Sequence, residues 1–273
     1  MGARINFFKM PAFQGNIATG NTIQTFLDGG PTYEELQLHC ANVVAADIAQ
    51  FIVEVNGDLR VQLTGQQMLD LEAYEGRTAT SNEFVFSFSD ALARTIQGEA
   101  SGGLVTKPGD RVLVKIVLGT LGGSEAFDLY AVTSPNRVEE LRRYVVPEAV
   151  PITLTGDNDY KGLRSGNFTN EIRIRRMFNY GNVTHLRIEQ DQRFPYGKDK
   201  LLKAVNDSLL ARHGKTVPSS CYVFDPIFRG NTLIDLFDTF SRQSLTVTMT
   251  TGDSNAVTSI VDYLEMTRQP AAA

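Results

Sequence analysis

A chain of 273 residues, 42% of them hydrophobic, can bury a full core in one large domain or in two domains of about 135 residues each. Its net charge of −5 argues against a protein that wraps nucleic acid by neutralising phosphates. No apolar run approaches the roughly 18–20 residues that a membrane-spanning helix needs, and the apolar stretch within residues 1–13 is too short for a secretory signal.

The first half of the chain is predicted to consist of short strands separated by turns. Residues 1–21, rich in Gly, Asn and Pro, are predicted to form an irregular N-terminal arm. Asn56-Gly57 is the strongest hairpin signal, because both residue types tolerate the positive φ angles of a two-residue turn. The hydrophobic pattern predicts strands over 22–27, 33–40, 51–55, 59–63, 84–88, 111–118 and 126–133, and helices over 65–75 and 91–97.

The second half repeats this pattern after a seam at Ser134-Pro135-Asn136. A brief linking helix is predicted over 138–144, and residues 269–273 form a tail. The stretch 199–213 is the clearest amphipathic helix, and Gly214 is a natural stop for it. Strands are predicted over 152–155, 171–178, 184–190, 222–224, 245–250 and 256–265, with a further helix over 232–238.

The two halves can be overlaid with an almost constant offset. Residues 53–55 line up with 187–189, 65–75 with 199–213, 84–86 with 222–224, 112–114 with 245–247, and 128–130 with 262–264. Repetition at this scale indicates a domain duplication rather than a solenoid. The alternative is a pair of generic β-sandwiches with accidental similarity.

We therefore predict an all-β fold of two eight-stranded antiparallel jelly rolls in tandem (a double jelly roll) with short flanking helices. The first jelly roll would cover residues 22–134, the linker 135–150 and the second jelly roll 151–268. The helices would protect the flanks of the sandwiches and contribute contacts between copies.

No complete catalytic or metal-binding motif is visible in the sequence. His39, His185 and His213 are too far apart for a cupin-type metal site, which needs closely spaced histidines and a carboxylate, and they are predicted to be surface or capping residues. No Gly-x-Ser-x-Gly elbow is present, and the glycine-rich stretch 98–103 lacks the Lys-Ser/Thr of a P-loop. We predict a protein that is not an enzyme, with no catalytic residue, metal ligand or cofactor.

Several groups of residues have two interpretations. Asp157-Asn158-Asp159 is predicted to lie in a loop, as a common turn or as a calcium site. The pairs Glu34-Glu35 and Glu139-Glu140 are interpreted as solvated faces, with a glycosidase carboxylate pair as the alternative. A group of arginines is interpreted either as a positive face that contacts lipid headgroups or an acidic neighbouring subunit, or as ordinary surface residues. Alternation places Arg173 and Arg175 on one strand face and Arg176 on the other, with Arg142, Arg143 and Arg164 as candidate neighbours.

Cysteine and aromatic residues add further expectations. Cys40 and Cys221 are predicted to be buried free thiols, with one disulfide as the alternative. The chain has no Trp, so Tyr33, Tyr74 and Tyr160 are the only loop-like candidates for a carbohydrate-binding platform. The arm is apolar enough to bind a membrane or a neighbouring subunit through Phe7, Phe8, Met10 and Phe13.

Three runs carry a resemblance to a known family: 184–191 (THLRIEQD), 209–218 (LLARHGKTVP) and 222–226 (YVFDP). They resemble the second half of double jelly-roll major capsid proteins of tailless icosahedral bacteriophages with an internal membrane, most closely the corticovirus type. Met10-Pro11, Gly15-Asn16, 20–22 and 261–265 (VDYLE) also resemble that group. The resemblance is specific over 184–265 and architectural over 22–133.

This resemblance implies two jelly rolls side by side, each roughly perpendicular to the capsid surface. Homotrimers with a pseudo-sixfold outline would tile an icosahedral shell over an internal lipid membrane. It also implies penton and minor capsid proteins as partners, possible contact with the viral membrane, no direct contact with nucleic acid and no small-molecule substrate. The protein would reside in the virion capsid after assembly in the host bacterial cytoplasm.

Two points stay open under this resemblance. Family members bind calcium at subunit contacts, but this sequence offers no clear ligand set for it. The alternative function is a carbohydrate- or receptor-binding double β-sandwich, such as a virion spike or a lectin-like module.

Overall fold

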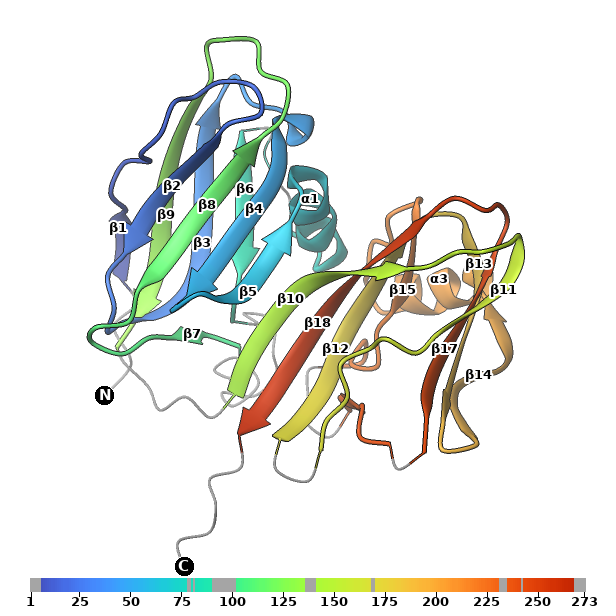
Figure 1. Ribbon diagram of the computed structural model, residues 1–273. Coiled ribbons are helices and arrows are strands. Elements are labelled where there is room, and N and C mark those ends of the chain that lie inside the picture. The colour runs from blue at the N-terminus through green and yellow to red at the C-terminus, as the bar shows by residue number, and fades with distance from the viewer. Residues whose placement is uncertain are drawn as a thin grey trace, which may run out of the picture. The chain divides into compact units, whose positions relative to one another are not determined.

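The computed structural model describes residues 6–77, 80, 82–89, 102–135, 141–167, 170–230, 235–241 and 243–267. The chain divides into two compact units, Met1–Val146 and Pro147–Ala273. Strands make up most of each unit (Figure 1), which confirms the predicted all-β class. No helix in the described part of the chain is both long and apolar enough to cross a membrane.

The first unit contains two antiparallel sheets. One has the strand order β1-β9-β3-β6, with β7 also paired to β3, and the other has the order β5-β4-β8-β2. The helix α1 packs against β4, β6 and the 3-10 helix η1. The elements are β1 (Asn6–Lys9), β2 (Thr22–Leu27), β3 (Thr32–Ala41), η1 (Ala45–Asp47), β4 (Ile48–Val55), β5 (Asp58–Leu63), α1 (Gly65–Tyr74), β6 (Glu83–Ser87), β7 (Leu104–Val105), β8 (Val112–Leu118) and β9 (Ala126–Ser134).

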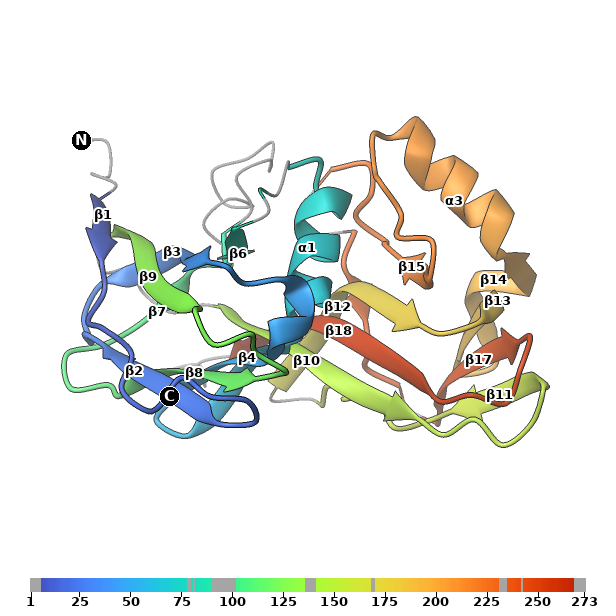
Figure 2. The same cartoon turned by 90° about the horizontal axis from the view of Figure 1, so that it is seen from above.

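The second unit contains the equivalent sheets, β15-β12-β18 and β14-β13-β17-β11. The helix α3 packs against β13, β14 and β15 (Figure 2). The elements are β11 (Gly156–Tyr160), β12 (Asn170–Tyr180), β13 (Val183–Gln190), β14 (Arg193–Leu202), α3 (Lys203–Arg212), β15 (Cys221–Phe224), β16 (Phe237–Asp238), β17 (Leu245–Thr251) and β18 (Val257–Thr267). The strand β10 (Leu141–Val150) runs across the division between the units, and its Val145 pairs in parallel with Val61 of β5.

The two units share one strand order, so the predicted repeat is present in the topology. The order β9-β3-β6 corresponds to β18-β12-β15, and β5-β4-β8-β2 corresponds to β14-β13-β17-β11. Each segment pair in the sequence overlay falls on equivalent elements, namely β4 and β13, α1 and α3, β6 and β15, β8 and β17, and β9 and β18. The hairpin signal is also confirmed, because Asn56 (φ 55°) and Gly57 (φ 84°) join β4 to β5.

Several predicted elements differ from the structure. The helix predicted over 138–144 is wrong for its described part, because residues 141–144 begin β10 and sheet pairing overrides their local preference. The strand predicted over 152–155 starts instead at Gly156. The helix predicted from residue 199 begins at Lys203, since 199–202 belong to β14. The helix at 91–97 lies outside the described residues, as do 231–234, and Phe237–Asp238 form the strand β16 rather than helix.

Charged side chains are buried in the core of the second unit. The Arg175 guanidinium lies 3.3 Å from the Asp262 carboxylate, with side-chain exposures of 1% and 3%. Arg176 pairs with Asp225 at the same distance. The interpretation of these arginines as a surface group is wrong, because a register shift between Ile174 and Arg176 breaks the side-chain alternation and both side chains are buried.

Both cysteines are buried and free, as predicted. Cys40 lies in β3 and Cys221 in β15. Burial raises the pKa of the Cys40 thiol to about 12, because the thiolate would lose its hydration.

Removing one partner of the buried pair should destabilise the second unit. Asp262→Ala leaves the Arg175 charge buried without this carboxylate, which should lower the free energy of unfolding by about 3–5 kcal/mol. Urea unfolding followed by circular dichroism measures the change. The control is Asp128→Ala, which breaks the exposed Lys9–Asp128 pair and should cost at most about 1 kcal/mol. Equal losses in the two variants would contradict the assignment.

Candidate functional site

The N-terminal arm bridges the two sheets of the first unit. Its strand β1 pairs antiparallel with β9, from Asn6 opposite Thr133 to Lys9 opposite Tyr130. Further along, the Thr25 hydroxyl donates to the Pro11 carbonyl at 2.9 Å, and Gln14 forms an isolated bridge with Gln24 of β2. The arm, predicted to be irregular, therefore attaches to an edge strand of each sheet.

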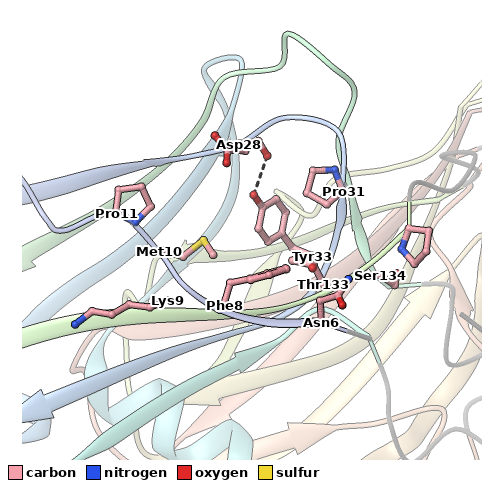
Figure 3. Close-up of a pocket in the computed structure, with 11 residues that line it drawn as sticks. Asn6, Phe8, Lys9, Met10, Pro11, Asp28, Pro31, Tyr33, Thr133 and Ser134 are labelled. Atoms are coloured by element: carbon pink, nitrogen blue, oxygen red, sulfur yellow. Dashed lines mark hydrogen bonds between the residues drawn. The ribbon is translucent and has the colours of Figure 1, made fainter. Parts of the chain in front are cut away.

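A cavity of about 770 Å³ lies beneath this arm (Figure 3). Tyr33 forms part of its wall, and its buried hydroxyl donates to the Asp28 carbonyl at 2.7 Å. Burial raises the pKa of the Tyr33 phenol to about 12, so it stays protonated at neutral pH. The lining residues are Asn6, Phe8, Lys9, Met10, Pro11, Asp28, Pro31, Tyr33, Thr133, Ser134 and Pro135.

The lining of this cavity suits contact with an apolar group better than catalysis. It contains no histidine or cysteine, and Lys9 forms an ion pair with Asp128 at 2.8 Å. On the other face of β1, Phe7 stacks on Tyr130 with ring centroids 5.4 Å apart. Phe7 and Phe8 are 57% and 50% exposed, so the arm presents aromatic surface to solvent.

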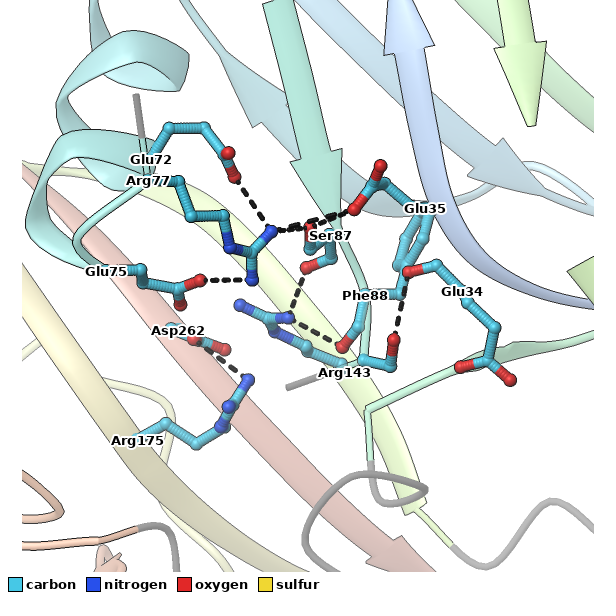
Figure 4. A network of polar contacts seen from close by, with 11 residues as sticks. Glu34, Glu35, Glu72, Glu75, Arg77, Ser87, Phe88, Arg143, Arg175 and Asp262 are labelled. Carbon is cyan, nitrogen blue, oxygen red and sulfur yellow. Dashed lines mark hydrogen bonds and ion pairs between the residues drawn. The ribbon is translucent and has the colours of Figure 1, made fainter. Parts of the chain in front are cut away.

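A polar network ties the end of α1 to β3 and β6 (Figure 4). The Arg77 guanidinium lies 2.8 Å from Glu75, 3.3 Å from Glu72 and 3.6 Å from Glu35, and it also donates to the Ser87 hydroxyl. These contacts join the end of α1 and the next strand, β6, to β3, which is distant from both in the sequence. Sequence reasoning missed the network, because nothing in the pattern marks Arg77 as the partner of three carboxylates.

The interpretation of Glu34 and Glu35 as a solvated face is wrong. Glu34 is buried and accepts a hydrogen bond of 2.5 Å from the Ser134 hydroxyl. Glu35 is only partly exposed and accepts from the Ser87 hydroxyl. A register shift between Tyr33 and Glu35 accounts for this placement. Glu139 and Glu140 lie outside the described residues.

Asp157, Asn158 and Asp159 were predicted to lie in a loop, but they lie in a strand. Asp157 and Asp159 are on β11, where they accept hydrogen bonds of 2.7 Å from Thr250 and Thr248 of β17. Lys200 also pairs with Asp157, and the Asn158 amide is buried. These oxygens therefore have partners within the sheet. No group of three or more metal-ligating side chains occurs among the described residues.

The histidines and the remaining arginines are dispersed. His39 is exposed beside Glu83, His185 contacts the Thr184 hydroxyl, and His213 is the C-cap of α3. Arg143 is buried and donates to the Ser87 and Phe88 carbonyls, whereas Arg164 is 42% exposed and lies over the Tyr263 ring.

The tyrosines do not form an exposed platform. Tyr33, Tyr74 and Tyr160 lie in β3, α1 and β11 rather than in loops, and each is buried. The Tyr160 hydroxyl donates to Glu148 at 3.2 Å. A carbohydrate-binding surface made from these three residues is therefore ruled out.

Titration of Glu72 should make the stability of the first unit depend on pH. Burial, reinforced by Glu75 and Glu35, outweighs the attraction of Arg77 and raises the Glu72 pKa from 4.5 to about 7. The folded state therefore holds a proton that the unfolded chain releases, so stability falls by about 1–3 kcal/mol as pH rises from 4.5 to 7. Glu72→Gln should flatten this slope in urea unfolding, and an unchanged slope would contradict the assignment.

Comparisons with known proteins agree on one family. The model for the viral coat protein P2 N-terminal domain matches residues 8–134, and the model for the viral coat protein P2 C-terminal domain matches residues 143–267. No curated protein matches the chain significantly.

Solved structures share the fold. The major capsid protein P2 from bacteriophage PM2 is similar with a TM-score of 0.84 at 19% identity, covering 96% of this chain and 98% of that one. The STIV MCP has a TM-score of 0.67 at 13% identity, with 99% and 100% covered. PBCV-1 VP54, fitted into a reconstruction of the virophage Sputnik, has a TM-score of 0.62 at 8% identity, with 100% and 97% covered. The chain has the predicted double jelly-roll fold and belongs to the viral coat protein P2 family.

Proposed function

We propose that the chain is the major capsid protein of a bacteriophage similar to PM2, and that it forms homotrimers that tile an icosahedral shell over an internal membrane. The observation that carries this proposal is the match of both coat-protein domains, in order, to the two units. The similarity to capsid proteins over nearly the whole chain supports it.

The internal repeat gives a physical reason for the trimer. Two units with the same strand order offer two similar sets of edges per chain. Three such chains around a threefold axis would offer six similar edges, which is the outline that a hexagonal lattice requires. A chain with only one such unit would give three similar edges in a trimer rather than six.

The arm and the charge fit the same proposal. Phe7 and Phe8 are exposed on β1 and could contact either the membrane or a neighbouring subunit. The net charge of −5 suits a shell that a membrane separates from the genome.

The remaining assignments are proposals of the same kind. They are a structural role without catalysis, penton and minor capsid partners, residence in the virion and assembly in the host bacterial cytoplasm. The domain limits at 22–134 and 151–268, with a linker over 135–150, stay predictions. Calcium at subunit contacts also stays open.

The test is the mass of the purified chain in solution. Light scattering after size exclusion should give three times 30.1 kDa, and averaged electron micrographs of that species should show six lobes with threefold symmetry. A chain that stays monomeric at every concentration and salt would overturn the proposal. Clear hits on a glycan array would favour a receptor-binding module instead.

A further inference from the structure

The turn between β4 and β5 contains the only Asn-Gly pair in the sequence, Asn56-Gly57. Both residues are exposed, and a Cβ built on Gly57 would have no atom within 4 Å of it. Asparagine before glycine is prone to deamidation, because glycine has no side chain to hinder attack by its backbone nitrogen on the asparagine amide carbon. The turn therefore holds a reactive pair at a surface that water reaches.

A hydrogen-bonded clasp holds the Asn56 side chain at both ends. Its Nδ2 donates to Asp110 Oδ1 at 2.9 Å, and its Oδ1 accepts from the Arg111 backbone N–H at 2.9 Å. The Asn56 backbone N–H also donates to the Arg111 carbonyl at 2.9 Å. The hydrogen bond from Asn56 is the largest of several effects that lower the pKa of Asp110, so the acceptor is a carboxylate at neutral pH.

The second unit has an equivalent clasp with the charge on the other side. Asp191 occupies the equivalent turn between β13 and β14, also with a positive φ of 49°. Its N–H donates to the Ser244 carbonyl at 3.0 Å, and its Oδ1 accepts from the Ser244 and Gln243 backbone N–H groups at 3.2 and 2.7 Å. Asp110 corresponds to Gln243, since each lies shortly before its strand, β8 or β17. Each clasp therefore combines one carboxylate with one amide.

We propose that Asn56 is a deamidation site that the clasp keeps closed in the folded chain. In this reaction the Gly57 backbone nitrogen loses its proton and bonds to Asn56 Cγ, the Cγ–Nδ2 bond breaks, and ammonia leaves with that proton. Water then opens the succinimide ring and gives aspartate or isoaspartate. The departing nitrogen is the one that donates to Asp110, and the side chain must rotate away from Arg111, so both hydrogen bonds oppose the reaction.

The product of the reaction would open the clasp. An aspartate in place of Asn56 would set two carboxylates against each other where one now accepts a hydrogen bond from an amide, a combination that neither clasp contains. Isoaspartate would add a backbone carbon to a two-residue turn whose length determines the register of the hairpin. Deamidation would therefore accumulate in chains that have not folded or whose turn has opened locally, and it would hinder their folding.

The test follows deamidation of Asn56 by peptide mass spectrometry at mildly alkaline pH, where more of the backbone nitrogen is deprotonated. The folded parent chain should react at least about ten-fold more slowly than the same chain in guanidinium chloride. Folded Asp110→Ala should react about ten-fold faster than the folded parent, because it lacks a charge-assisted hydrogen bond. The matched control is Asp70→Ala, which removes a carboxylate that bonds to Gln66 of α1 and should leave the rate unchanged.

A second pair of variants tests the effect of the product without the reaction. Asn56→Asp should lower the urea midpoint of unfolding, because it places a second carboxylate beside Asp110. Adding Asp110→Asn should restore most of that loss, since the clasp then has the charge arrangement of the second unit. Circular dichroism checks that each variant folds.

Three results would overturn the proposal. An unfolded chain that does not react at Asn56 would remove the site, and equal rates in the folded and unfolded parent would remove the protection by the fold. A folded Asp110→Ala variant that reacts at the parent rate would show that the clasp does not control the reaction. If Asp110→Ala does not fold, the parent rates and the restoration by Asp110→Asn decide.

Discussion

A register shift in one central strand of each unit determines where charged side chains enter the core. In the first unit the shift lies between Tyr33 and Glu35 of β3, and in the second between Ile174 and Arg176 of β12. These strands are equivalent in the two sheet orders, and each pairs with the last strand of its repeat, β9 or β18. The residue inside each shift, Glu34 or Arg175, is buried. An extra residue thus directs a charge inward, where simple alternation would not.

The buried charges then constrain the rest of each core. Glu34 accepts from Ser134 of β9, and Arg175 pairs with Asp262 of β18, so each charge bonds to the strand that pairs with its own. A buried ion pair adds little net stability over an apolar pair of similar size, but a charge without its partner is costly. A slip of one residue would separate these partners and also turn the hydrophobic face outward. We infer that the polar contacts fix the register, while burial of the apolar residues supplies most of the stability.

The difference between the local apolar pattern and the long-range polar contacts explains how much could be predicted from the sequence. Alternation and turn chemistry located the Asn56-Gly57 hairpin and most strands, because both depend on near neighbours in the chain. The repeat was also visible, since equivalent elements keep the same spacing. The burial of Glu34 and Arg175 was not predictable, because it depends on a shift relative to a distant strand. The contacts of Arg77 and the cavity beneath the arm were missed for the same reason.

Contacts between segments that are distant in the sequence also explain why two units with the same strand order have different surfaces. The first unit covers its own helix with η1 and bridges its two sheets with the arm, and it carries polar residues at Thr64 and Gln67. The second unit has a short turn in place of η1 and exposes Leu202 and Val205. If six identical units formed a closed ring, every helix would need the same cover. Because the covers differ, the two units of one chain are not interchangeable, and the repeating element of any assembly is the whole chain.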